Sequence, residues 1–291
     1  MKLPLTLLAV MLLGACTKTP EEPARGPAVQ AAMPAPPTQD KILELIYPER
    51  KTVDGQRVWE PSKDETKGLE DSESDSLLDS QLVTQVVQVI PVIQGNQFKL
   101  LALTSAATEA CHACSALAGI ALLTYRDGAW RVQLQNRAAK VMGSWGRVPA
   151  GRLLEIGPER YGVLIEHTDG NQGEFSTRPT LLGQTETGLG SLLPPELAEI
   201  GAENSGSGNC SDSEDDRTFD SKVNPQVCYS YSSSFSTDAE EGSAYYELRL
   251  ETHGTRLEKD NSDKVVRVDA LRIFRFGNGH YQEVKRKIGR R

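Results

Sequence analysis

The feature that most constrains the fold is a pair of apolar segments separated by Asp127 and Gly128. The second segment, residues 130–134, alternates apolar and polar side chains, and this two-residue period is typical of a β-strand with one face on a core. Asp-Gly favours a tight turn because both positions adopt positive φ angles at low steric cost. Residues 120–134 therefore predict an antiparallel β-hairpin.

Short apolar strands and turn residues continue on both sides of this hairpin. Further strands are predicted at residues 86–93, 98–103, 153–156, 161–165, 246–252 and 266–276. Pro91 removes a backbone donor inside the first of these, so we expect that strand at a sheet edge or at a bulge. The predicted fold class is all-β: an antiparallel meander, sandwich or barrel, with propeller-like sheets as the alternative.

Two stretches have compositions that do not support a packed core. Residues 16–39 are rich in Pro, Ala and Glu and predict an extended, semi-rigid spacer. Residues 202–223 combine Gly and Ser with acidic side chains and predict a disordered acidic insertion. Between them, residues 40–85 predict a short helix capped by Asp40 and an acidic loop. The β-rich domain is expected over residues 86–291, as one sheet system or as two domains divided by the insertion.

The N-terminus carries the pattern of an export signal. Lys2 precedes an apolar run of about eleven residues, which suits a signal-peptide core and is shorter than the roughly 20 residues of a spanning helix. Residues 13–16, Leu-Gly-Ala-Cys, follow directly and resemble the lipobox of bacterial lipoproteins. The resemblance covers only this first part of the chain. It implies that residues 1–15 are removed as a signal peptide and that Cys16 becomes the acylated N-terminus.

The same resemblance implies a membrane-anchored protein of the cell envelope. Each buried methylene contributes ~0.8 kcal/mol, so two or three acyl chains on Cys16 give stable anchoring. In lipoproteins of bacteria with two membranes, Asp directly after the cysteine favours retention in the inner membrane. Thr17 occupies that position here and implies the outer membrane, facing the periplasm. The first expected partner is therefore the membrane, through the lipid on Cys16.

The charge balance argues against nucleic acid as a partner. The formal net charge is −8, and a net negative surface repels phosphate backbones. The exception is the basic tail at residues 285–291. We expect a solvated end there, with a contact to anionic lipid head groups as the alternative.

The cysteines predict two disulfides. Five cysteines minus the acylated one leave four, and outside the cytoplasm an even number favours disulfide pairing. The predicted pairs are Cys111 with Cys114 and Cys210 with Cys228. The second pair would close roughly 19 residues around the acidic insertion, a constraint of about 3 kcal/mol in the chain-entropy model. It would pin the insertion to the sheet.

The Cys-His-Ala-Cys segment at residues 111–114 admits four interpretations. The favoured one is a structural disulfide on a turn. A thioredoxin-like redox pair needs Cys111 at a helix N-terminus, where the dipole lowers the thiol pKa. Residues 148–149 would then supply the proline that packs on such sites, although Ala110 replaces the usual aromatic residue. A zinc half-site needs two further ligands, and a free thiol pair of unassigned role is the fourth interpretation.

Other sequence motifs for catalysis, metal binding or cofactor binding are incomplete or missing. Acidic residues alternate at 212–220 as in calcium loops, but Arg217 and Val223 occupy the EF-hand positions for Gly and Glu. The sequence has no Gly-x-Ser-x-Gly elbow, zinc-protease motif or phosphate loop. His167 and Asp169 predict a strand-end pair rather than a catalytic one. We therefore expect no catalytic residue, no bound metal and no cofactor.

These features favour a non-enzymatic envelope lipoprotein whose disulfide-stabilised β domain binds or scaffolds an envelope protein. The first alternative is an inhibitor or immunity protein against an envelope-targeting hydrolase, with residues 206–220 as the loop that plugs the active site. The second is a thiol-disulfide oxidoreductase using Cys111 and Cys114. The serine-rich run at residues 230–236 is expected to be an exposed strand face or a binding surface for glycan or protein.

Overall fold

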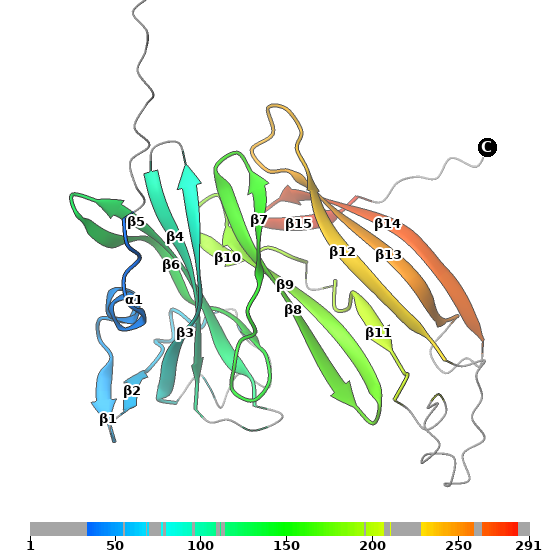
Figure 1. The fold of residues 1–291 in the computed structure, drawn as a ribbon, viewed down its shortest axis with the longest axis horizontal. Helices are drawn as coiled ribbons and strands as arrows, with labels where there is room; N and C mark the ends of the chain where they lie inside the picture. The colour runs from blue at the N-terminus through cyan, green and yellow to red at the C-terminus, as the bar shows by residue number, and fades with distance from the viewer. Residues whose placement is uncertain are drawn as a thin grey trace, which may run out of the picture. The chain divides into compact units, whose positions relative to one another are not determined.

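The computed structural model confirms the predicted all-β class (Figure 1). It describes residues 34–54, 56–67, 69, 77, 80–94, 97–108, 111, 114–194, 196–206, 210, 228–258 and 264–284. Within these residues the chain forms one α-helix and fifteen strands, arranged as two antiparallel sheets. The predictions for the signal peptide, acylation of Cys16, most of the spacer, most of the acidic insertion and the basic tail fall outside the described residues.

The first sheet has six strands that follow one another in chain order. They are β1 (Lys51–Val53), β2 (Gln56–Trp59), β3 (Leu82–Gln94), β4 (Gln97–Ala107), β5 (Ala116–Arg126) and β6 (Ala129–Met142). The hairpin of β5 and β6 is the one that Asp127 and Gly128 predicted. Their φ angles are 52° and 78°, and the pairing places Tyr125 opposite Trp130.

The second sheet has nine strands, in the order β15-β14-β13-β12-β11-β9-β8-β7, with β10 paired to β9. Its strands are β7 (Arg152–Gly157), β8 (Arg160–Asn171), β9 (Glu174–Gln184), β10 (Leu189–Ser191), β11 (Gly201–Glu203), β12 (Ser230–Asp238), β13 (Glu247–Leu257), β14 (Val265–Gly277) and β15 (His280–Glu283). Ala202 and Glu203, expected to begin the acidic insertion, instead belong to β11, and the rest of the insertion lies between β11 and β12, which pair with each other. It therefore interrupts a single sheet and does not divide two domains.

Pro91 has the predicted effect on its strand. β2 pairs with β3 only at Leu82 and Val83, so the half of β3 that holds Pro91 pairs with β4 alone. A bulge interrupts the β3–β4 register between Val86 and Gln88. The unpaired edge accommodates a strand residue that lacks a backbone donor, whereas the bulge lies four residues before Pro91, which is itself in register with Leu100.

The N-terminal helix begins two residues earlier than the sequence suggested. Helix α1 (Gln39–Ile46) is capped by Thr38, whose Oγ1 accepts the Lys41 N–H at 3.3 Å. Asp40 is therefore not the cap; it lies in the first turn, where its charge complements the helix dipole. Among the described residues, no helix has the length and apolar character needed to span a bilayer.

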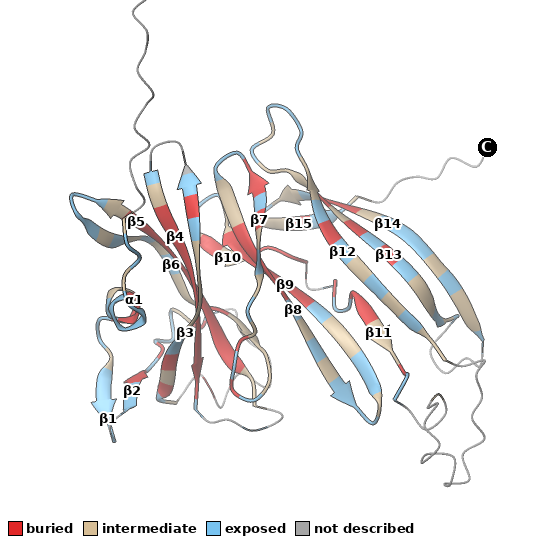
Figure 2. Cartoon of the chain, in the orientation of Figure 1, coloured by how far each residue is buried: buried red, intermediate tan, exposed pale blue. Residues whose placement is uncertain are grey.

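Three apolar cores hold the described residues together, and β4 and β5 take part in two of them. In β4, Leu100 and Ala102 belong to the first core, with α1 and Trp59. Their neighbours Leu101 and Leu103 point the other way into the second core, with residues of β8 and β9. Figure 2 shows buried residues along nearly the whole of both strands. This double burial explains why neither strand alternates in sequence.

The third core joins β7–β9 to β12–β15. Leu164 and Leu181 lie on the side of β8 and β9 opposite the second core, and they pack with Phe235, Leu248 and Phe274. The nine-stranded sheet is therefore buried on both sides of β8 and β9. Free surface is left mainly at the ends of the strands and on the exposed side of β12–β14.

Candidate binding surface

The connection between β6 and β7 is a tight turn, residues 143–149, which we call the Trp145 turn. Gly143, Trp145 and Gly146 have φ angles of 85°, 55° and 63°. The Arg147 N–H donates to the Ser144 carbonyl at 3.0 Å. A side chain at position 143 would collide with the Arg147 carbonyl, so the turn requires glycine there.

Two contacts fasten the Trp145 turn to the first sheet. The Gly146 N–H donates to the Cys114 carbonyl at 2.7 Å, and the Val148 N–H donates to Ser105 Oγ at 3.2 Å. Ser105 is fully buried in β4. Cys114 is paired with Cys111, with their Cα atoms 4.9 Å apart, as the spacing predicted. The disulfide thus braces the loop against which the turn rests.

Trp145 itself is exposed and held in an unfavourable conformation. Its side chain is 54% exposed, although burying an indole is a large source of stability. A left-handed φ costs an L-residue about 1–2 kcal/mol, and such conformations gather at functional sites. Tryptophan is also among the residues most enriched at binding hot spots. An exposed indole on a backbone held in a left-handed turn therefore marks this turn as a candidate binding surface.

The indole borders a concavity of about 580 Å³ on the surface of the sandwich. Its lining combines apolar side chains with a guanidinium, an imidazole and a hydroxyl, and consists of Ser144, Trp145, Arg147, Val148, Pro149 and His167. His167 Nε2 lies 2.7 Å from Asp169 Oδ1, and the imidazole is 12% exposed. The Asp169 carboxylate fixes the orientation of the imidazole ring. The two residues form the pair near the end of β8 that the sequence predicted. This lining includes tryptophan and arginine, two residue types enriched at protein interfaces.

The second disulfide lies at the base of the acidic insertion. The Cα atoms of Cys210 and Cys228 are 5.2 Å apart, in the pairing that the sequence favoured. Next to them, the Tyr229 N–H donates to Asn204 Oδ1 at 2.8 Å, and the Gly206 N–H donates to the Gly173 carbonyl at 3.1 Å. These contacts hold both ends of the insertion on the sheet. The calcium-loop and plug predictions concern residues outside the described part of the chain.

Strand directions bring these features to one end of the sheets, which we call the loop end. β6 ends at the Trp145 turn, and β5 starts directly after the Cys111–Cys114 loop. β11 pairs antiparallel with β9, with Glu203 opposite Phe175 near the start of β9. The insertion therefore starts beside the turn between β8 and β9. β7 begins at the same end of the sheet. In Figure 1 the loop end is the lower side of the drawing.

The surroundings of Cys111 and Cys114 bear on the redox interpretation. That interpretation needs a helix that starts at Cys111, whereas the pair lies between strands β4 and β5, and β5 begins at Ala116. Pro149 does belong to the turn that contacts Cys114, as the interpretation assumed. The short stretch between Cys111 and the start of β5 leaves no room for the helix that the redox interpretation requires.

The zinc interpretation lacks its further ligands among the described residues. Cys210 and Cys228 pair with each other. In the part of the chain that the structure describes, no three His, Cys, Asp or Glu side chains are grouped as metal ligands.

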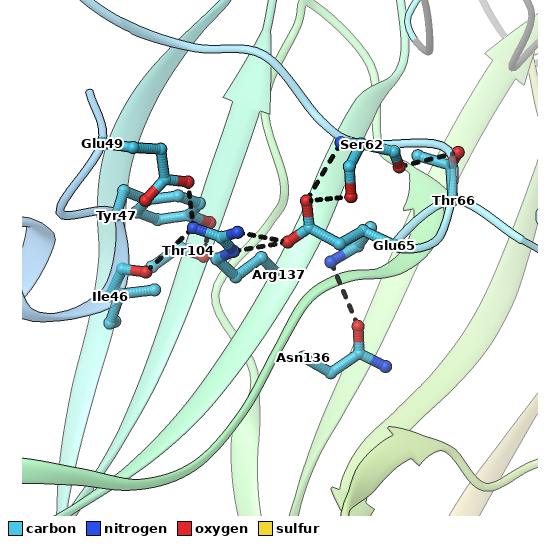
Figure 3. A network of polar contacts seen from close by, with 10 residues as sticks. Ile46, Tyr47, Glu49, Ser62, Glu65, Thr66, Thr104, Asn136 and Arg137 are labelled. Carbon is cyan, nitrogen blue, oxygen red and sulfur yellow. Dashed lines mark hydrogen bonds and ion pairs between the residues drawn. The ribbon is translucent and has the colours of Figure 1, made fainter. Parts of the chain in front are cut away.

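A second polar cluster, around Arg137 of β6, was not anticipated from the sequence (Figure 3). Its guanidinium pairs with Glu65, at 2.6 Å from Nε, and with Glu49. It also lies 5.2 Å from the centroid of the Trp59 ring. Burial raises the pKa of Glu65, but hydrogen bonds from Ser62 and Arg137 outweigh it and hold that pKa below its usual value. All these partners come from this chain, so the cluster fastens residues 46–65 to the first sheet.

One buried hydroxyl completes this attachment. Tyr47, which follows α1, places its hydroxyl 2.7 Å from Thr104 Oγ1 inside the first core. Burial raises the pKa of Tyr47 to about 12, so the phenol stays protonated and able to donate.

Comparison of the chain with protein-family models, with curated proteins and with solved structures gives no match. The case for function therefore depends on the surfaces described above. In the sequence, residues 143–146 read Gly-Ser-Trp-Gly, which does not have the spacing of a nucleophile elbow. Its two glycines were the signal for a tight turn that presents the tryptophan.

Proposed function

We propose that the chain is an exported lipoprotein, acylated at Cys16, whose β-sandwich binds an envelope protein through the Trp145 turn without catalysing a reaction. The observation that carries the binding proposal is the indole of Trp145, fixed in a left-handed turn beside a disulfide and left exposed. Anchoring rests on the lipobox resemblance at residues 13–16 and on the basic and apolar segment before it. An outer-membrane location follows from Thr17.

The cysteine pairing supports export. Four of the five cysteines form two pairs among themselves, and such pairs persist in oxidising compartments. Cys16 is then the fifth cysteine and has no place in either pair. Acylation of its thiol requires this.

Anchoring is tested by intact-mass analysis of the membrane fraction. We expect a mature chain that begins at Cys16 and carries the mass of a diacylglyceryl group. Cys16→Ser should give an unmodified chain that no longer sediments with membranes. A mature wild-type product beginning elsewhere, or an unmodified Cys16, would contradict the anchor.

Binding is tested with a photo-crosslinking amino acid in intact envelopes, at position 144 or, for comparison, at position 271. Leu271 is also a large exposed side chain, 51% exposed, but lies in β14. We expect one envelope protein to be captured from position 144 and not from position 271. Truncating a hot-spot residue costs at least about 2 kcal/mol, so Trp145→Ala should weaken binding roughly 30-fold or more. Leu271→Ala should leave it unchanged.

The identity of the captured protein decides between scaffold and inhibitor. A cell-wall hydrolase, inhibited by the wild-type chain and not by Trp145→Ala, would make this an immunity or inhibitor protein. Equal capture from both positions would refute the Trp145 turn as the binding surface.

A further inference from the structure

The last residues of the spacer form a short left-handed polyproline segment. Residues 34–37 read Pro-Ala-Pro-Pro, and a residue that precedes proline is confined to extended or polyproline geometry. Thr38 continues it with φ −62° and ψ 157°. Pro34 and Pro37 are half-buried, whereas Ala35, Pro36 and Thr38 are exposed. A period of three is that of a polyproline helix with one face on the protein.

The surface that meets this segment is aromatic. At the tip of the β5–β6 hairpin, Tyr125 and Trp130 are opposite each other, with ring centroids 5.3 Å apart at 61°. The Asp127-Gly128 turn fixes this register. The Trp130 indole Nε1 donates to the Ala35 carbonyl at 3.0 Å. The two partners of this hydrogen bond are 95 residues apart in the sequence.

We propose that the β5–β6 hairpin is a binding site for a polyproline segment, and that its occupant is residues 34–37 of the same chain. Aromatic-lined surfaces bind Pro-x-x-Pro segments because the segment is already extended and loses little entropy. Its carbonyls have no internal hydrogen bonds and accept from donors such as an indole N–H. Pro34 and Pro37 supply that spacing, and Trp130 supplies the donor.

The site determines where the spacer leaves the folded domain. Trp130 and Met142 lie near the two ends of β6, a span of about 40 Å at ~3.3 Å per residue. The Trp145 turn follows Met142 directly. The spacer therefore departs from the end of the first sheet opposite the loop end. If the chain is anchored as proposed, this arrangement directs the Trp145 turn away from the membrane; the docking of residues 34–37 itself does not depend on anchoring.

The first test measures hydrogen exchange of the Trp130 indole N–H by NMR, using the mature chain with Cys16→Ser so that no lipid is involved. The chain has three tryptophans, and Trp130→Phe assigns the signal. We expect Pro34→Gly with Pro37→Gly to speed this exchange about 5- to 10-fold, as loss of one hydrogen bond implies. The matched control, Pro20→Gly with Pro23→Gly, removes the same spacing elsewhere and should leave the exchange unchanged.

The second test places p-benzoylphenylalanine at Met33 in the same chain. We expect photo-crosslinks to the peptide that contains Tyr125 and Trp130, and their loss in the Pro34→Gly, Pro37→Gly variant. Exchange that is equally fast in all three chains, or crosslinks spread over the loop end, would overturn the proposal. Neither result would affect acylation of Cys16 or capture through Trp145, which are measured separately.

Discussion

Gly119 in β5 lies against the side chains of Tyr47 and Thr104. Its replacement by alanine tests how Tyr47 attaches the N-terminal segment to the first sheet. A Cβ at this position would lie 2.9 Å from both the Arg137 carbonyl oxygen and the Tyr47 hydroxyl, and closer still to Thr104 Oγ1. The side chains of Tyr47 and Thr104 are buried, and the Arg137 carbonyl belongs to strand β6. The register of β5 and β6 is also interrupted here, between Ala118 and Ile120. On its other side Gly119 is paired with Thr104 of β4, and this pairing limits how far the backbone can move away.

Two contributions set the size of the effect. Adding a methyl group to a packed core costs about 1–3 kcal/mol. The hydroxyl pair of Tyr47 and Thr104, 2.7 Å apart, would also separate, at a net cost of about 1 kcal/mol. We expect Gly119→Ala to lower the free energy of unfolding by about 2–4 kcal/mol, a large share of the 5–15 kcal/mol typical of a domain.

The assay is urea denaturation followed by tryptophan fluorescence and far-UV circular dichroism. Trp59, whose ring centroid is 5.0 Å from that of Tyr47, reports on this core. The matched control is Gly188→Ala, because a Cβ there meets no atom within 4 Å and the residue is not left-handed. We expect Gly188→Ala to be neutral or slightly stabilising, because it reduces the entropy of the unfolded chain.

A double-mutant cycle with Tyr47→Phe separates crowding from a general effect of alanine. Removing the hydroxyl relieves one of the three contacts, so Gly119→Ala should cost about 1 kcal/mol less in that background. If Gly119→Ala and Gly188→Ala had equal unfolding midpoints, the reasoning about this core would be refuted. Full additivity in the cycle would refute the part assigned to Tyr47.

Three further predictions concern the charges, disulfides and turn. Because Glu65 has a lowered pKa when folded, its pair with Arg137 stabilises the protein above the unfolded pKa of about 4.3 and is lost as pH falls through the folded value. Wild-type stability should therefore fall more steeply between about pH 5 and 3 than that of Glu65→Gln, measured by urea midpoints. Serine at both Cys210 and Cys228 should cost about 3 kcal/mol in the same assay, against about 2 kcal/mol for the shorter loop of the other disulfide; equal costs would contradict the chain-entropy reasoning. Trp145→Asn should stay within about 0.5 kcal/mol of wild type, because asparagine tolerates a left-handed φ, yet lose partner capture; a large loss of stability would show that the indole is structural.

The sequence predicted the features that depend on near neighbours. Asp127-Gly128 implied its hairpin because few residues adopt two positive φ angles in succession. The partial edge of β3 followed from the missing donor of Pro91. The disulfide pairing followed from spacing, because short loops close most readily.

Features set by distant residues were not predictable in this way. β1 is exposed at every position, so it carries no alternation, and residues 40–85 were expected to form only a helix and a loop. Whether residues on either side of the insertion share a sheet depends on β11 pairing with both β9 and β12. The exposure of Trp145 runs against the propensities of tryptophan for burial and for negative φ. Only the positions of Gly143 and Gly146 hinted at it.

The layering of the sheets limits where the proposed binding surface can lie. β4 and β5 are buried on both faces over nearly their whole length, so neither presents an open face to a partner. The remaining surface lies on the exposed positions of β1, β6 and β12–β14, on the parts of β8 and β9 next to the turn that joins them, and at the ends of the strands. One end receives the spacer at Trp130, whose indole N–H is already used. The other end carries both disulfides and the Trp145 turn, so rigidity and an exposed aromatic side chain coincide at the end opposite the contact of Trp130 with Ala35.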